Sequence, residues 1–543
     1  MVKWMKRKSV LAVMLAAVMM IAAGCQAVGG VDLNQMLKQT LKVGAYEGSQ
    51  TLEFKLLMDE GELGASEEDK ALFDLISHIK LTLDDIKVKD AENASFKGKL
   101  ELGKKQIGFK LAMNAEAAVL ELDGAKKPIV LEVANLMASN ELFGQVVDQE
   151  LSIDGKPDQP ELTQDQEESL AKAGQQLIET VAGYAIDKLP NPARIKVSPA
   201  QETVRGENVN VMHVQAELSG KEIYPWIKSY MDALVSDKEN LRKTIAAVYD
   251  LVQSQEDVLG SAGVDTESIF GSIPEEDDRS KAIDEAVNEI VQGIADLKQE
   301  MEQAEKEEAD FVNAIFNEET FVKADLFVDS KLDVRKSVIE VSVKPSAVEG
   351  DEEMSFSPIT GIWIKATSEK SNVNGDIKPD EAVIPKDGLT VEQFFDMQGY
   401  QVLRQFDNNS VMYDILRNQM HISRQQIHMY PEYSSNPPII TPAGITLIPL
   451  RDTSDRLGAT IKATDKGKSI TLRDDATSTT IELKSGSKQA AINGKTVNWS
   501  FPVTVVDGVT YVPARDFVKA LGGKVYWEDS YDDEKMLVIE REL

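Results

Sequence analysis

The chain has 543 residues, of which 42% are hydrophobic and 28% charged, and its formal net charge is −32 at pH 7. Length and composition indicate about three globular domains with hydrophobic cores. So acidic a chain lacks the Lys and Arg patches that bind phosphate, which excludes a direct role on DNA or RNA, and its single cysteine excludes an intrachain disulfide or a thiolate zinc site.

The first 25 residues have the layout of an export signal. Lys3, Lys6, Arg7 and Lys8 precede an apolar run at 10–23, which is shorter than the roughly 20 residues of a membrane-spanning helix. The run ends in Ala-Ala-Gly-Cys, which resembles a bacterial lipoprotein signal. The resemblance implies removal of residues 1–24, lipidation of Cys25, and attachment to the extracellular face of the membrane, as in Gram-positive bacteria. A plain cleaved signal with an incidental cysteine is the alternative.

After a short lipidated tether at 25–30, residues 31–380 are predicted to form one body domain. Ile107, Phe109, Leu111 and Met113 alternate with other residues, which indicates a strand with one buried face. Turn residues at 103–106 and 123–124 predict hairpins on either side. We therefore expect an antiparallel sheet, with a half-barrel as one form that it can take.

Long helices follow these strands. Thr163 and Gln166 have capping-box spacing, and apolar residues then recur on one face until Pro190. A second helical run covers 226–252, with a break near Ser236, and a third covers 281–303. Strands return at 320–332, 338–343 and 361–366. Strands at both ends with helices between them predict the α+β class.

Residues 381–440 are predicted to be a helical connector that ends in a Pro-rich linker. Residues 441–543 then carry one pattern twice, first at 446–458 and again at 510–522. Each copy predicts a short strand, a proline that ends it, a short helix, and a glycine after the helix.

This segment resembles the copper amine oxidase N-terminal-like domain, a stalk module of secreted Gram-positive proteins. The residues that carry the likeness are Ile492-Asn493-Gly494-Lys495, 508–515, 520–525 and Trp527. The resemblance implies a small α+β domain of two repeated units that engages the cell envelope and has no catalysis of its own.

Four residues of this segment are candidates for contact with an anionic wall polymer: Arg451, Arg515, Tyr511 and Trp527. Their structural alternatives are pairing of each arginine at its helix start and packing of each aromatic ring in the core.

The sequence argues against an enzyme and predicts no cofactor. A copper amine oxidase needs three histidine ligands, and of the four histidines His421 and His428 are seven apart, or roughly 10 Å on one helix, too far to share a metal. We find neither G-x-S-x-G nor H-E-x-x-H. A glycosidase built on paired carboxylates stays open.

Two functions remain. The first is a lipid-anchored, non-enzymatic adaptor or binding module whose stalk-like domain engages the envelope. The alternative is a carrier or sensor of an apolar, acyl ligand, because the body is similar in its order of strands and helices to the LolA/LppX-like lipoproteins, whose half-barrel holds acyl chains. The apolar faces of 107–113 and 212–218 can line such a cavity or form ordinary core.

Overall fold

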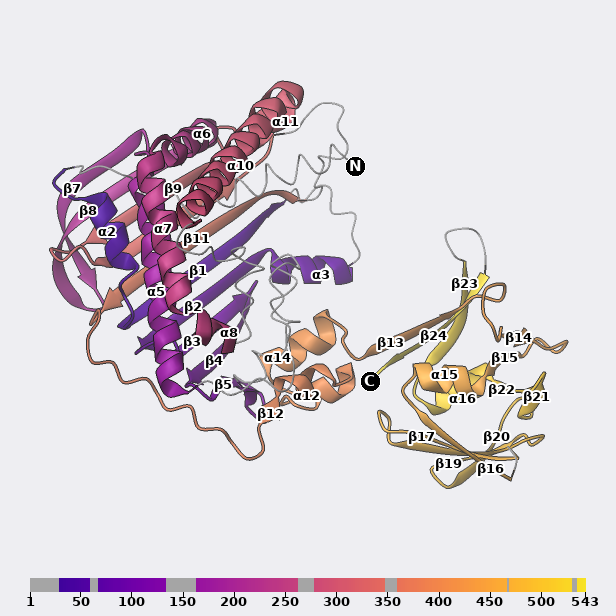
Figure 1. Ribbon diagram of the computed structural model, residues 1–543. Coiled ribbons are helices and arrows are strands. Elements are labelled where there is room, and N and C mark those ends of the chain that lie inside the picture. The colour runs from indigo at the N-terminus through magenta and orange to yellow at the C-terminus, as the bar shows by residue number, and fades with distance from the viewer. Residues whose placement is uncertain are drawn as a thin grey trace. The chain divides into compact units, whose positions relative to one another are not determined.

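The computed structural model describes residues 29–58, 67–132, 163–261, 278–346, 359–465, 468–529 and 535–543. These residues belong to two compact units (Figure 1). The body extends to Thr390, apart from residues 124–127. Those four residues belong with Val391–Leu543 to the C-terminal unit.

The described strands of the body form one 12-stranded sheet in the order β12-β6-β5-β4-β3-β2-β1-β11-β10-β9-β8-β7. Neighbouring strands are antiparallel except β12 and β6, so the predicted α+β class is confirmed but the sheet is mixed, not purely antiparallel. The strands are β1 (Tyr46–Met58), β2 (His78–Val88), β3 (Ala94–Leu102), β4 (Lys105–Met113), β5 (Ala117–Leu122), β6 (Ile129–Glu132), β7 (Arg194–Val204), β8 (Glu207–Ser219), β9 (Phe321–Val328), β10 (Val334–Val343), β11 (Ile359–Ser371) and β12 (Leu389–Thr390).

The predicted hairpins form where glycine permits a left-handed backbone. Gly103 (φ 55°) lies between β3 and β4, and Gly124 (φ 82°) lies between β5 and β6. A residue with a Cβ atom is strained at such positive φ angles, whereas glycine is not.

Long helices lie over one face of the sheet, the inner face (Figure 1). Thr163 and Gln166 form the predicted capping box, and Ser219 and Glu222 form another before α6. Asp237 separates α6 from α7 and accepts a hydrogen bond from the Asn240 amide, which confirms the predicted break. The body helices are α2 (Leu33–Thr40), α3 (Glu67–Ile76), α5 (Gln164–Asp187), α6 (Gly220–Ser236), α7 (Lys238–Ser254), α8 (Glu256–Ser261), α10 (Arg279–Glu307) and α11 (Ala309–Ile315).

The C-terminal unit is built on the predicted repeat. Its two copies meet where β15 pairs with β22 in antiparallel register, with Ile448 opposite Val512. Gly458 and Gly522 end the two short helices with φ of 74° and 79°. The elements are α12 (Val391–Phe395), α13 (Gly399–Leu403), α14 (Val411–Asp414), the π-helix η4 (Ile415–Gln419), β13 (Arg424–Met429), β14 (Ile439–Ile440), β15 (Thr446–Pro449), α15 (Leu450–Arg456), β16 (Thr460–Thr464), β17 (Ser469–Asp474), β18 (Thr479–Lys484), β19 (Gln489–Ile492), β20 (Lys495–Asn498), β21 (Thr504–Val506), β22 (Val509–Pro513), α16 (Ala514–Ala520), β23 (Lys524–Asp529) and β24 (Lys535–Glu542).

One predicted helical stretch is wrong. Residues 424–429 form strand β13, which pairs with β24 inside the C-terminal unit. The reason is local: Ile427 and Met429 are buried while His428 between them is exposed, which is the period of a strand. His421 has φ 48°, a left-handed conformation outside any helix, so His421 and His428 do not share one.

Candidate ligand-binding site

The inner face of the sheet is apolar on both of its halves, but the helices that the structure describes fully cover just one half. In β8, β9 and β10 the inward side chains Leu218, Val322 and Val341 are at most 5% exposed and pack against α6, α10 and α11. Val214 and Leu326 are buried in the same way against α2. This half is an ordinary core.

The other half, formed by β1 to β6 and β11, has inward side chains that keep solvent contact. Leu52 is 42% and Ile362 is 37% exposed, whereas Ile86 and Ile107 on the same face are buried, at 4% and 2%. A continuous apolar surface of this kind commonly marks a ligand or partner site. The large apolar inward side chains are Leu52, Phe54, Leu56, Ile79, Leu81, Leu83, Ile86, Phe96, Leu100, Leu102, Ile107, Phe109, Leu111, Met113, Leu120, Leu122, Ile129, Leu131, Ile362 and Ile364.

The helices carry a matching apolar hollow of about 460 Å³. Sites for small molecules commonly have roughly 300–1,000 Å³. Two of its lining residues, Val181 and Ile290, are 48% and 41% exposed, so the hollow is open. Its lining comes from α5, α6, α7 and α10: Val181, Tyr184, Ala185, Leu234, Leu241, Thr244, Ile245, Val248, Tyr249, Val252, Ala286, Ile290 and Ile294.

The amphipathic pattern of the helices indicates which way this hollow faces. Glu179, Thr180 and Ala247 line two more polar hollows on α5 and α7, one of which shares Tyr184 and Thr244 with the apolar hollow. An amphipathic helix turns its apolar side inward. We infer that the apolar side of α5, α7 and α10 is turned to the sheet. The hollow and the solvent-accessible inward side chains of β1 to β6 and β11 together are called the trough below.

No charged side chain lines the helical part of the trough. The Tyr184 hydroxyl donates to the carbonyl of Leu234 at 2.5 Å, and the Thr244 hydroxyl donates to the carbonyl of Asn240 at 3.0 Å. Burial, with a smaller effect of the Asp237 carboxylate, raises the pKa of Tyr184. Such a lining suits an aliphatic molecule.

The opposite, outer face of the sheet carries charges in a regular row. Each residue of the row stands directly opposite the next on the neighbouring strand, and the sign alternates throughout. Opposite charges across strands stabilise a sheet, and they also favour one register over a slipped one. From β7 to β3 the row is Arg194, Glu217, Lys323, Glu340, Lys365, Glu53, Lys80 and Glu101.

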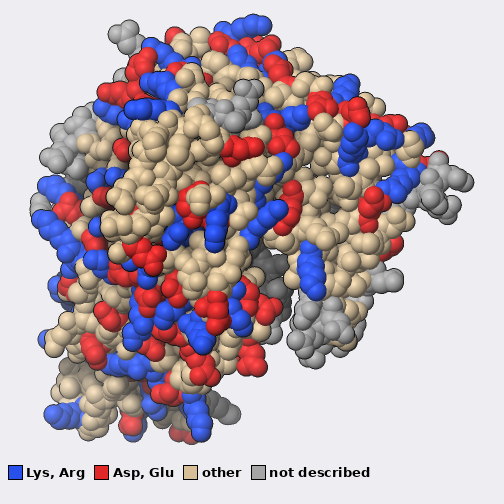
Figure 2. All heavy atoms as spheres, turned by 90° about the vertical axis from the view of Figure 1, so that its left-hand side faces the viewer, with Lys and Arg blue, Asp and Glu red and all other residues tan. Residues whose placement is uncertain are grey.

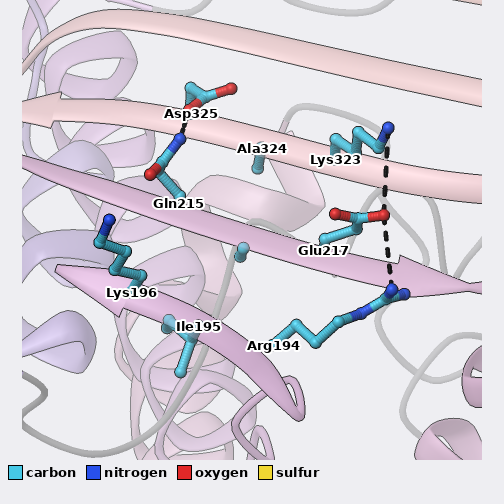
Figure 3. A pocket seen from close by; sticks show the side chains of 9 residues that line it. Arg194, Ile195, Lys196, Gln215, Glu217, Lys323, Ala324 and Asp325 are labelled. Atoms are coloured by element: carbon cyan, nitrogen blue, oxygen red, sulfur yellow. Dashed lines mark hydrogen bonds and ion pairs between the residues drawn. The ribbon is translucent and has the colours of Figure 1, made fainter.

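A shallow hollow of about 320 Å³ lies over the start of this row (Figure 3). Arg194 Nη1 and Lys323 Nζ flank the Glu217 carboxylate at 3.6 and 3.9 Å. Asp325 is likewise occupied, because it accepts a hydrogen bond from Gln215 at 3.0 Å. These groups satisfy one another, so we assign the hollow to the sheet and not to a ligand. Across the face seen in Figure 2, basic and acidic side chains are interspersed.

The structure places the four envelope candidates in different surroundings. Arg451 and Arg515 are exposed, and among the described residues neither has a hydrogen bond or ion pair, so the predicted pairing at the helix starts is not present there. Tyr511 is 4% exposed and belongs to the core. Trp527 is half-buried, with its indole N–H 3.4 Å from the Thr446 hydroxyl. Since β15 and β22 are antiparallel, the two arginines follow opposite ends of that strand pair.

Cys25 and the histidines are the other residues that the sequence singled out. Cys25 lies outside the described residues. His78 and His213 lie on β2 and β8 and contact Glu53 and Asp325, respectively. In the described part of the chain no three His, Cys, Asp or Glu side chains are grouped to hold a metal ion, and no helix is long and apolar enough to cross a membrane.

Sequence reasoning identified part of the trough. It named the apolar faces of 107–113 and 212–218 as either cavity or core, and the structure separates them: Phe109, Leu111 and Met113 line the trough, whereas Val214 and Leu218 are core. The helical side was missed. Its signal was present in Leu241, Ile245, Val248 and Val252, which recur with the period of one helix face.

Residues 405–533 match the family described as the copper amine oxidase N-terminal domain. The match begins before residue 441, where the sequence pattern predicted the start of this domain. This agrees with the pairing of β13 with β24, because β13 also lies before residue 441. This likeness by itself assigns no copper chemistry to the chain. The body lies outside the match, and comparison with curated protein sequences finds nothing that matches the chain.

Proposed function

We propose that the protein is a non-enzymatic, lipid-anchored binding protein on the extracellular face of the cell membrane, and that its body carries or senses an aliphatic ligand in the trough. This proposal rests on one observation: the helices bury the apolar inner face of the sheet unequally. Ile107 on β4 and Leu218 on β8 are buried, but Leu52 and Ile362 between them in the sheet are more than a third exposed.

The energetics favour an aliphatic occupant. Each methylene group moved from water into an apolar site gains about 0.8 kcal/mol. At roughly 30 Å³ for a group of about the size of water, the 460 Å³ of the helical hollow hold about 15 such groups. That matches one acyl chain of ordinary length, and the sheet side offers further apolar surface.

The anchor rests on the first 25 residues. Their basic start, short apolar run and Cys25 fit export and lipidation in the Gram-positive manner, and a doubly acylated cysteine holds a protein firmly to a bilayer. An anchored body with an apolar trough is suited to take its ligand from the nearby membrane.

The C-terminal unit is proposed to contact the cell envelope. Its likeness to the copper amine oxidase N-terminal domain supports this, as do the free guanidinium groups of Arg451 and Arg515. Cosedimentation with isolated cell walls tests this part. The double variant Arg451→Gln, Arg515→Gln should bind less, and undiminished binding would contradict the assignment of the two arginines.

The trough is tested on the full chain carrying Cys25→Ser, so that no covalent acyl chain is present. We expect native mass spectrometry of protein from a Gram-positive host, followed by solvent extraction, to find a stoichiometric aliphatic molecule. Protein that is empty, and that also fails to bind an added apolar dye, would leave the adaptor without a bound ligand as the better account.

A further inference from the structure

The helical part of the trough contains one hydroxyl group that is not already used. Tyr184 and Thr244 donate to backbone carbonyls, whereas the hydroxyl of Tyr249 has no partner among the described residues. Tyr249 is half-buried and its hydroxyl keeps solvent contact, so it can exchange a hydrogen bond to water for one to the polar end of a ligand.

The charges near Tyr249 limit what that ligand can be. Arg279 pairs with Asp250, the residue after Tyr249, and Arg242 Nε lies 2.7 Å from Asp284 on the neighbouring helix. Arg279 and Arg242 are therefore both neutralised by carboxylates. Acidic residues also outnumber basic ones along α10. A ligand anion would find no free counter-charge here, and it would be repelled by these acids.

We propose that Tyr249 anchors an uncharged single-chain amphiphile, an aliphatic chain that ends in an ester or hydroxyl group. This inference rests on the proposed function, because it names the ligand class of the same trough. The α7 residues of the lining run from Leu241 to Val252, roughly 17 Å along the helix. Tyr249 lies near one end of this run, so the polar end of the ligand sits beside Tyr249 and the chain extends toward Leu241.

The test uses the full chain with Cys25→Ser and displacement of an environment-sensitive apolar dye. The competitors are a monoacylglycerol of about 14 carbons, chosen to fit the hollow, and the fatty acid of the same chain at pH 8. We expect the monoacylglycerol to bind at least about tenfold more tightly than the acid, because the carboxylate must lose its hydration without a counter-charge. Tyr249→Phe should weaken monoacylglycerol binding roughly 3- to 10-fold relative to dye binding.

Tyr184→Phe is the matched control. Its hydroxyl already donates to Leu234, so its loss should leave the ratio of monoacylglycerol to dye affinity unchanged. Equal monoacylglycerol affinity in wild type and Tyr249→Phe would overturn the role of Tyr249. Equal affinity for acid and monoacylglycerol would overturn the uncharged ligand class. Failure of wild type to bind even the dye would instead overturn the proposed function.

Discussion

Arg541 and Asp474 form an ion pair in which both side chains are 1% exposed, with Nη1 and Oδ2 2.7 Å apart. The same guanidinium donates to the carbonyls of Leu457 and Leu521, the equivalent residues that end α15 and α16. Gln425 on β13 accepts from Nε at 2.6 Å. One arginine thus holds the ends of both repeated helices, where backbone carbonyls lack partners.

Arg541→Met is therefore expected to destabilise the C-terminal unit by about 3–5 kcal/mol, because it leaves the Asp474 carboxylate buried and unpaired. Hydrogen exchange of residues 446–543 in increasing urea measures the effect. Arg473→Met is the matched control, since Arg473 pairs with Asp475 on the surface and should contribute about 0–1 kcal/mol. Equal effects of the two substitutions would contradict a central role for Arg541.

The charged row on the outer face gives a second prediction. Lys365 stands between Glu340 and Glu53, so Lys365→Glu places three carboxylates side by side. We expect the body to lose about 1–2 kcal/mol of unfolding free energy. The loss should shrink in 1 M salt, where screening acts within about 3 Å. Lys196→Glu makes the same charge change opposite the neutral Gln215 and should have little effect, and a loss that ignores salt would argue against the row.

Sequence reasoning recovered those parts of the fold that neighbouring residues encode. The alternation at Ile107, the cap at Thr163, the helix break near Ser236 and the repeat around Pro449 each depend on a few adjacent positions. It missed Arg541, whose partner Asp474 is 67 residues away, and instead considered Arg451 and Arg515. It likewise could not separate Leu111 from Leu218. A period of two tells which side chains share a face but not whether a helix covers them.

Alkaline pH should weaken the packing of α6 on α10. Burial, with smaller effects of Glu305 and Glu302, raises the pKa of Tyr224 from 10.0 to about 12, and its hydroxyl donates to the Met301 carbonyl at 2.6 Å. Because the folded-state pKa is the higher one, this contribution to stability is complete below pH 10 and is lost as the pH rises through about 12.

Tyr224→Phe tests this directly. It should lower the free energy of unfolding by about 1 kcal/mol at pH 8 and make the decline above pH 10 shallower than in wild type. Urea titrations at several pH values measure both effects. Tyr433→Phe, at a ring that is 74% exposed, serves as the control, and an unchanged alkaline slope in Tyr224→Phe would refute the assignment.

If Cys25 is lipidated, the protein should be found in the membrane fraction. Cys25→Ser removes the only sulfur that can be acylated, so the protein should move from the membrane fraction to the medium or remain an unprocessed precursor. Fractionation followed by intact-mass measurement distinguishes these outcomes from wild type. Retention at the membrane with an unchanged acylated mass would rule the anchor out.

Filling the helical hollow should abolish binding without unfolding the body. Ala286 lines the hollow from α10, and Ala286→Phe places a ring in its open volume. The new ring occupies existing space, so we expect little loss of stability, whereas overpacking of a filled core would destabilise by about 1–3 kcal/mol. Dye affinity should fall at least about tenfold, because the ring removes most of the apolar surface that the dye buries. Ala295→Phe makes the same change at an exposed position of the same helix and should bind dye like wild type. If both variants bind dye equally well, the aliphatic ligand does not sit between α5, α7 and α10.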